Sequence, residues 1–106
     1  MQELDIKRGH YARIDGRVDE MMKDIFGNVR EEDGWYVSEY GAMQPIKVQL
    51  KGKKAVLVDI ITVSDVDEQT AIDTIKAKNR FLEGLTGYNA KERAKKLQEK
   101  AKKGKL

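Results

Sequence analysis

Carboxylates are the side chains of this sequence most suited to acid–base or metal chemistry, and they gather in two clusters. Residues 31–33, Glu-Glu-Asp, are consecutive. Because neighbouring residues of a strand point to opposite faces, these three are badly placed to share one proton or ion. Asp65, Asp67 and Glu68 precede a helical pattern but lack the alternating ligands and glycine of a calcium loop. We therefore expect a solvated hairpin, a helix start and no metal site.

Nucleophiles and phosphate loops are not recognisable. The sequence has no cysteine, and Ser38 and Ser64 stand outside any G-x-S-x-G motif. Its nine glycines form neither G-x-G-x-x-G nor a Walker loop. The one histidine, His10, needs an orienting carboxylate and a substrate before it can act as a base, so we interpret it as a loop or core hydrogen-bonding residue. We predict no catalytic residues, no cofactor and no enzyme activity.

Asp59 stands in the most apolar stretch of the chain, residues 55–63. A buried Asp59 would have to be paired or protonated, which would mark a site. The alternative is that Asp59 points to the wet face of a sheet, opposite in phase to Val58 and Ile60. We favour the wet-face interpretation.

A basic C-terminal segment is the best functional signal. The net charge of +3 divides into +6 over residues 88–106, which hold eight Lys/Arg and two Glu, and −3 over residues 1–87. A cationic row on a helix suits phosphate contacts, which are blind to sequence and sensitive to salt. The predicted contacts are Lys91, Arg93, Lys95 and Lys96, with Arg80 a lesser candidate. The alternative is a solvated helix whose lysines only confer solubility.

A second candidate surface is the open face of the predicted sheet. Lys47, Gln49 and Lys51 point there by alternation, and Tyr36 and Tyr40 are candidates to join them. Cations interleaved with aromatic rings suit single-stranded nucleic acid. Either surface could instead be a subunit interface, because open faces and exposed edges invite self-association.

The elements that would position these residues follow from periodicity and turn signals. Leu4 and Ile6 indicate a short strand, and an apolar stripe predicts a helix over about residues 13–26, ended by Gly27. Four strand-like segments follow, at residues 29–32, 35–40, 46–50 and 55–63. Asp33-Gly34 is a hairpin signal between the first two, and Gly41 and Pro45 bracket the next turn.

Two helices complete the chain. The first opens with Ser64 and Asp67 as a capping-box variant, carries a stripe of five apolar residues and ends at Gly87. The stripe consists of Ala71, Ile72, Ile75, Leu82 and Leu85. Gly84 lies near its end and is expected to permit close packing. Asn89 and Glu92 indicate a capped start of the second helix, which has a narrow seam of Ala90, Ala94, Leu97 and Ala101.

These elements predict an α+β fold in the order β-α-β-β-β-β-α-α. Hairpin links make the sheet of about five strands antiparallel, and its one dominant apolar face is expected to carry the helices. At 106 residues the chain suits one domain, which we assign to residues 1–87. Residues 88–106 form a basic helix packed on this domain or extending from it.

Three segments carry a resemblance to a known family. Residues 79–93, NRFLEGLTGYNAKER, together with KRGHYARI and SEYGA, resemble a small archaeal family of unknown function that is found notably in methanogens. The resemblance runs along most of the chain. It implies a fold like one half of the TATA-binding protein, a curved antiparallel sheet backed by helices. It supplies no activity, cofactor or site.

The sequence thus indicates a non-catalytic binding module whose expected partner is nucleic acid. The alternatives are a protein-interaction or homo-oligomerisation module, motivated by the alanine seam, and a small-ligand binding protein or enzyme. No apolar run approaches the length of about 20 residues that spans a membrane, so we expect no membrane partner. A chain without cysteine suits a cytoplasmic location.

Overall fold

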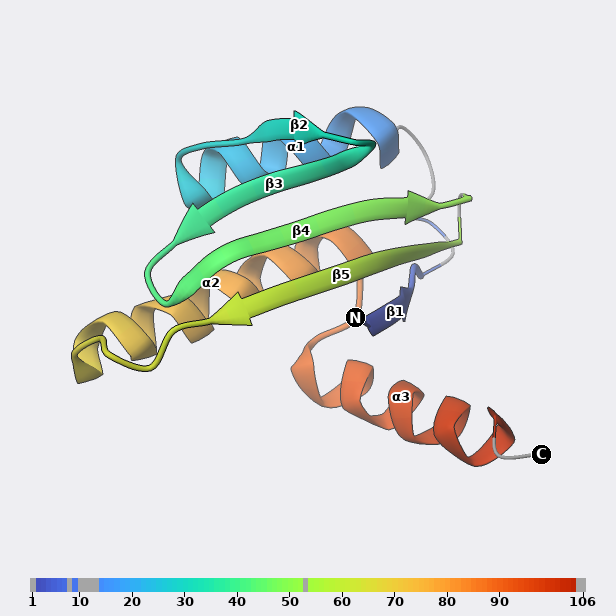
Figure 1. Cartoon of the computed structure of the whole chain (residues 1–106). Coiled ribbons are helices and arrows are strands. Elements are labelled where there is room, and N and C mark those ends of the chain that lie inside the picture. The colour runs from blue at the N-terminus through green and yellow to red at the C-terminus, as the bar shows by residue number, and fades with distance from the viewer. Residues whose placement is uncertain (1, 8, 10–13, 53, 105–106) are drawn as a thin grey trace.

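The computed structural model describes residues 2–7, 9, 14–52 and 54–104, with side chains for all of these except residues 14, 15 and 100–104. Its elements follow the predicted order (Figure 1). They are β1 (Gln2–Asp5), α1 (Ile14–Phe26), β2 (Arg30–Glu32), β3 (Trp35–Tyr40), β4 (Met43–Lys51), β5 (Ala55–Thr62), α2 (Glu68–Thr86) and α3 (Ala90–Gly104). The α+β class predicted from the sequence is confirmed.

The five strands form one antiparallel sheet in the order β1-β5-β4-β3-β2. Strands β2 to β5 follow one another as hairpins, and β1 joins the outer edge of β5. Asp33 and Gly34 both have positive φ, 52° and 84°, as the predicted two-residue hairpin turn requires. Pro45 does not bracket a turn. It lies inside β4, between Met43 and Ile46, where the pairing with β5 shifts register.

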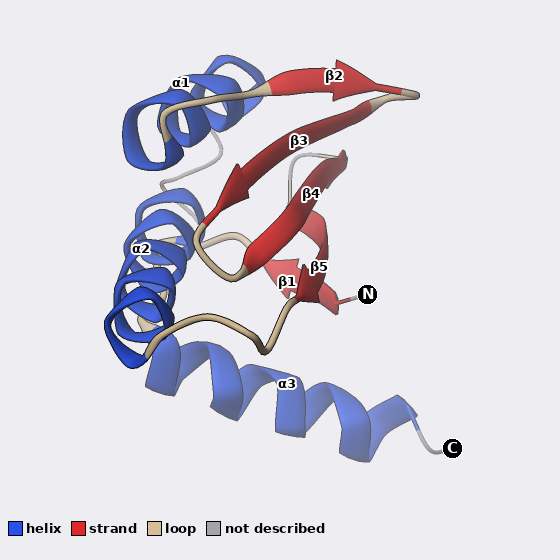
Figure 2. Ribbon diagram, turned by 60° about the vertical axis from the view of Figure 1, so that its left-hand side comes forward, coloured by secondary structure: helices blue, strands red, loops and turns tan. Residues whose placement is uncertain are grey.

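Helices α1 and α2 cover one face of the sheet and leave the other face open (Figure 2). The core between the layers includes Val18 and Met22 from α1 and Phe81 from α2. From the sheet, Ile46 and Val48 are fully buried against them, which confirms the predicted alternation in β4. Burial of apolar side chains on this one face is the main favourable contribution to folding.

Gly84 lies where α2 packs closely against α1. A Cβ at this position would lie 2.6 Å from Cε of Met21 on α1. The carbonyl oxygen of Gly84 also accepts a hydrogen bond from Nη2 of Arg17 on α1 at 2.6 Å. The predicted packing role of Gly84 is therefore confirmed.

Helix α2 differs from the sequence prediction at two points. Its N-cap is Asp67 instead of Ser64: Oδ1 of Asp67 accepts a hydrogen bond from Thr70 N at 2.8 Å. Its predicted apolar stripe is wrong at Ile72 and Ile75, which are 39% and 56% exposed. The face that packs on the core runs instead through Thr74, Ala77, Phe81, Leu82, Leu85 and Thr86.

Helix α3 lies beside β1 at one edge of the molecule, and its C-terminal end points away from the sheet (Figures 1 and 2). It begins where Gly87, with φ of 81°, ends α2 in a left-handed cap whose N–H donates to Glu83 O. Within the described part of the chain, no helix has the length and apolar character needed to span a membrane.

Candidate functional site

The start of α3 is fixed by a reciprocal capping box. Glu92 N donates to Asn89 Oδ1 at 2.9 Å, and Asn89 N donates to Glu92 Oε1 at 3.0 Å. Two backbone N–H groups that a helix start leaves without intrahelical partners are thereby satisfied. The capping pair predicted from the sequence is confirmed.

Arg93 anchors α3 to the rest of the fold. It is 7% exposed, and its guanidinium donates to Tyr88 O at 2.7 Å and to Asn79 Oδ1 on α2 at 3.0 Å. Burial lowers the pKa of Arg93, while the charge of Glu83 acts in the opposite direction. The guanidinium is thus engaged inside the protein. We therefore leave Arg93 out of the surface available to phosphate.

This contact explains the segment that carries the family resemblance. Its two ends, Asn79 and Arg93, are hydrogen-bonded to each other, and the left-handed cap at Gly87 and the capping box lie between them. Residues 79–93 therefore form a structural corner that sets the angle between α2 and α3. This role does not depend on a ligand.

Four lysines lie on or beside the first part of α3, and we call them the α3 lysine surface: Lys7, Lys91, Lys95 and Lys96. Lys91 and Lys95 are exposed and stand one helical turn apart. Nζ of Lys96 lies 4.7 Å from the centroid of the Tyr88 ring, and Nζ of Lys7, which follows β1, lies 5.9 Å from it. Two elements far apart in sequence thus contribute cations to one place.

Acidic side chains modify this surface. Glu92 and Glu99 line a shallow hollow of about 250 Å³ together with Tyr88, Lys95 and Lys96. Glu92 is committed to the capping box. Further lysines follow at positions 100, 102, 103 and 105 in the sequence, outside the described side chains.

Two other predicted features of the C-terminal region lie elsewhere. Arg80 is exposed on α2 and lines a different hollow, with Ile25 and Tyr40, so the structure does not group it with the α3 lysine surface. The predicted seam of α3 is wrong at Ala90 and Ala94, which are both exposed. Leu97, which belongs to the predicted seam, does pack on the body, together with Arg93.

The sheet-face prediction requires a correction at both tyrosines. Tyr36 pairs with Val48, and paired residues of antiparallel strands share a face. Tyr36 and Tyr40 therefore pack against the core on the helix side, where the ring centroid of Tyr40 is 5.7 Å from that of Phe26. The register of β3 against β4 decides this, and strand alternation alone could not give it.

The open face carries mixed charge. Lys47, Gln49 and Lys51 alternate with the buried side of β4 as predicted, but acids accompany them. Lys51 Nζ lies 2.7 Å from Glu3 Oε1, and Lys47 is paired across strands with Asp59. On β2, Arg30 forms ion pairs with Glu32 and Glu39. This face therefore lacks both tyrosines on which the prediction rested, and acids accompany its lysines.

Asp59 and His10 were the two single-residue candidates for chemistry. Asp59 lies on the open face, half-buried and opposite in phase to the buried Val58, so the wet-face interpretation is confirmed. His10 lies outside the described residues. In the described part of the chain, no group of three or more His, Asp or Glu residues is arranged to hold a metal ion.

Sequence reasoning missed a hollow of about 500 Å³ between β5 and α2. Its apolar lining includes Met43, Ile60, Ala71 and Ile75, and Asp59 contributes to its rim. The sequence feature that could have revealed it is the difference in length between the first strand and the strand of residues 55–62. A strand of four residues cannot cover a neighbour of eight.

Comparison with known proteins gives a family and a fold neighbour. A family model described as a domain of unknown function (DUF5611) matches residues 1–99. The chain is also similar to the solution structure, determined by NMR, of hypothetical protein TA0095 from the archaeon Thermoplasma acidophilum. The two are 28% identical with a TM-score of 0.65, over 92% of this chain and 97% of that one. None of the curated proteins compared matches the chain.

Proposed function

This chain belongs to the DUF5611 family, whose function is unknown, and we propose that it is a non-catalytic binding module that contacts nucleic-acid phosphates through the α3 lysine surface. The supporting observation is the anchoring of α3 by Arg93, which turns Lys91 and Lys95 outward. Because the helix is held at a fixed angle, these cations form a row without a further entropic cost of ordering the backbone.

The chemistry of this surface favours phosphates over bases. Lys7 and Lys96 both approach the Tyr88 ring, which is half-buried, so the ring is a poor platform for base stacking. Lysine is a strongly hydrated point charge that suits contacts to phosphate oxygens without reading sequence. We therefore expect binding that depends on salt and is indifferent to base sequence.

Three further expectations belong to this proposal. A cytoplasmic location agrees with a chain that contains no cysteine. The likeness to one half of the TATA-binding protein stays a prediction, and the antiparallel sheet with two helices on one face is compatible with it. A methanogen source likewise stays a prediction from the sequence.

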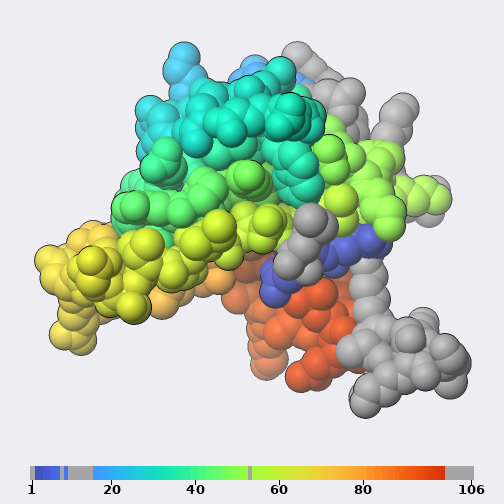
Figure 3. Space-filling model, viewed as in Figure 1, coloured from blue at the N-terminus to red at the C-terminus, as the bar shows by residue number. Residues whose placement is uncertain are grey.

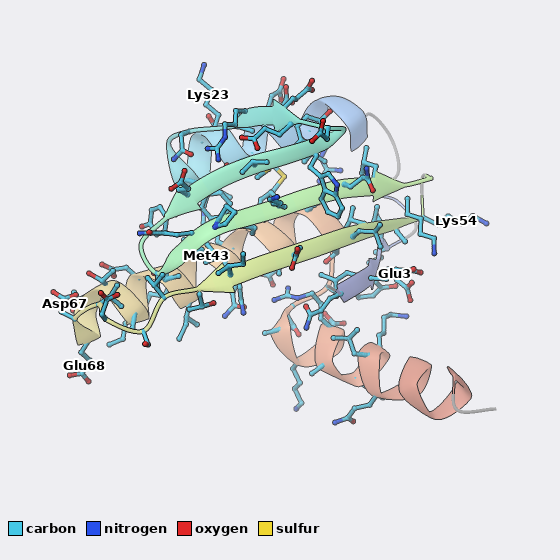
Figure 4. The ribbon with its side chains drawn as sticks, in the orientation of Figure 1. Glu3, Lys23, Met43, Lys54, Asp67 and Glu68 are labelled. Carbon is cyan, nitrogen blue, oxygen red and sulfur yellow. The ribbon has the colours of Figure 1, made fainter. Side chains whose placement is uncertain are left out.

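Filter binding to a duplex DNA of about 30 base pairs, at several salt concentrations, tests the proposed function. The variant Lys91→Ala/Lys95→Ala should weaken binding on every DNA sequence and reduce the slope of log K against log salt by about 2. The matched control is Lys23→Ala/Lys76→Ala, which replaces one exposed lysine on α1 (Figure 4) and one on α2. Absence of binding at low salt, a salt-independent affinity, or an equal loss in the control would each overturn the proposal.

A further inference from the structure

Strand β1 covers the outer edge of β5 along only half of its length. Strand β1 pairs with it from Asp5 opposite Ala55 to Gln2 opposite Val58. Strand β5 continues to Thr62, and among the described residues no strand pairs with its outer edge beyond Val58. Ile61, in this uncovered part, is 57% exposed. Such an edge presents backbone N–H and C=O groups that can pair with another strand.

An apolar floor lies beside this edge. The hollow of about 500 Å³ runs between β5 and α2, and we call it the β5 groove. Ile60 lines it from the sheet, and Ala71 and Ile75 line it from α2. Figure 3 shows this end of β5 and the residues that follow it at the molecular surface.

The exposed floor continues a buried stripe of the same helix. Ala71, Ile75, Lys78, Leu82 and Leu85 follow one another at intervals of three or four residues, so they share one face of α2. At the far end, Leu82 and Leu85 are buried in the core cluster together with Leu4 of β1. At the near end, beyond Gln2, the first residue of β1, Ile75 is 56% exposed. A strand continuing the line of β1 would complete the same packing there.

The rim of the β5 groove is acidic. Asp59, Asp67 and Glu68 line it, and Lys78 is the one basic residue among its lining residues. Asp67 and Glu68 stand together at the start of α2, past the end of β5 (Figure 4). Three carboxylates and one lysine leave a net charge of −2, which Lys47, opposite Asp59 on β4, and the positive end of the helix dipole offset in part. The remaining negative charge favours a basic occupant.

We propose that the β5 groove docks an extended basic segment of a partner protein, which adds a strand to β5 in line with β1. Main-chain hydrogen bonds to the open edge supply affinity, and alternate side chains supply specificity. Because successive side chains of a strand point to opposite faces, one set faces Ile60 and Ile75 and the other lies beside Asp59. The fitting segment therefore alternates β-branched apolar residues with Lys or Arg.

This site is independent of the proposed nucleic-acid surface. It uses residues of β5 and α2, whereas the α3 lysine surface uses Lys7 and residues of α3. Loss of one activity should leave the other intact. The variant Lys91→Ala/Lys95→Ala therefore serves as a folded protein in which docking to the β5 groove is expected to persist.

The test uses three end-capped, fluorescently labelled hexapeptides in anisotropy titrations against the full chain. They are Lys-Val-Lys-Val-Lys-Val, its scrambled form Lys-Lys-Lys-Val-Val-Val, and the acidic form Glu-Val-Glu-Val-Glu-Val. We expect the alternating basic peptide to bind at least tenfold more tightly than either of the others. Its binding should protect every second backbone amide within residues 59–62 from hydrogen exchange, because the amides that point away from β4 gain strand partners.

Two isoleucines provide a matched pair of variants. Ile75→Lys places a cation on the floor of the β5 groove. It should lower the affinity for the alternating basic peptide by at least tenfold, since the burial of one Ile side chain contributes about a tenfold change in affinity. Ile72→Lys makes the same change on the same helix at an exposed residue outside the lining, and should leave binding unchanged. Both sites are partly exposed, so both variants should fold.

Several outcomes would overturn the proposal. They are equal binding of the alternating and scrambled peptides, equal effects of the two isoleucine variants, and no amide protection in residues 59–62. Sedimentation showing that a second copy of this chain occupies the groove, with dimers abolished by Ile75→Lys, would also overturn it. Dimers unaffected by that variant, with peptide binding retained, would support the proposal.

Discussion

Replacing Arg93 with methionine should destabilise the fold although the residue lies on a helix covered with lysines. Met keeps most of the apolar stem and removes the guanidinium, which donates to Tyr88 O at 2.7 Å and to Asn79 Oδ1 at 3.0 Å. A hydrogen bond from a charged group contributes about 1.5–3 kcal/mol. The one hydroxyl proton of Thr86 is donated to Leu82 O at 2.6 Å, so the 3.4 Å contact of Thr86 Oγ1 with Tyr88 O does not replace the lost hydrogen bond.

The expected decrease in the free energy of unfolding is therefore about 3–4 kcal/mol, at the lower end of the sum for two such bonds. For a chain of this size that corresponds to a fall in Tm of roughly 10–20 °C. The assay is equilibrium unfolding in urea, followed by far-UV circular dichroism, which reports on all three helices. The slope against urea should stay unchanged, because the surface exposed on unfolding is similar.

Lys91→Met is the matched control. It makes the same substitution two residues earlier on the same helix, at an exposed site, and should change stability by no more than about 0.5 kcal/mol. A double-mutant cycle with Asn79→Ala should show a coupling of about 0.5–2 kcal/mol, because the two side chains share a hydrogen bond. If the unfolding midpoints of Arg93→Met and Lys91→Met coincide, the assignment of Arg93 as an anchor is refuted.

Gly41→Ala should lower stability by about 2–4 kcal/mol, because φ is 52° and the new Cβ would overlap Thr74 Oγ1, which accepts from Ala42 N. Gly84→Ala should change stability by no more than about 1 kcal/mol, since the gain in helix propensity offsets the displacement of the flexible end of Met21. Unfolding in urea measures both variants, and equal losses would contradict this reasoning. Hydrogen bonds from the Thr70 side chain and, second, from its backbone N–H lower the pKa of Asp67. The stabilisation that Asp67 contributes is therefore fully present above its unfolded-state pKa of about 3.9, and it is lost as pH falls through the lower folded-state pKa. Asp67→Asn keeps a capping side chain that does not titrate. Its Tm should therefore fall less between pH 5 and pH 2 than the Tm of the unmodified protein. Parallel curves of Tm against pH would contradict the role of Asp67 as a titrating N-cap.

The sequence by itself determined the elements, because local chemistry specifies them. Asp33-Gly34 allows the positive φ values of a tight hairpin, Gly87 allows a left-handed cap, and Asn89 with Glu92 satisfies the backbone of a helix start. The alternation of Ile46 and Val48 with Lys47 likewise identified the buried face of β4. Each of these signals acts over a few residues, so neighbouring residues suffice to predict it.

Only the tertiary structure decided which side chains are available to a partner. Arg93 belongs to a lysine-rich helix by sequence, yet α2 supplies the acceptor Asn79 that takes its guanidinium out of the surface. Tyr36 faces the helices because it pairs with Val48, a register set between strands. Ile75 is exposed because β1 pairs with β5 only as far as Val58, and no other strand among the described residues covers this part of α2. In each case the deciding neighbour is distant in sequence, and local pattern carries no information about that neighbour.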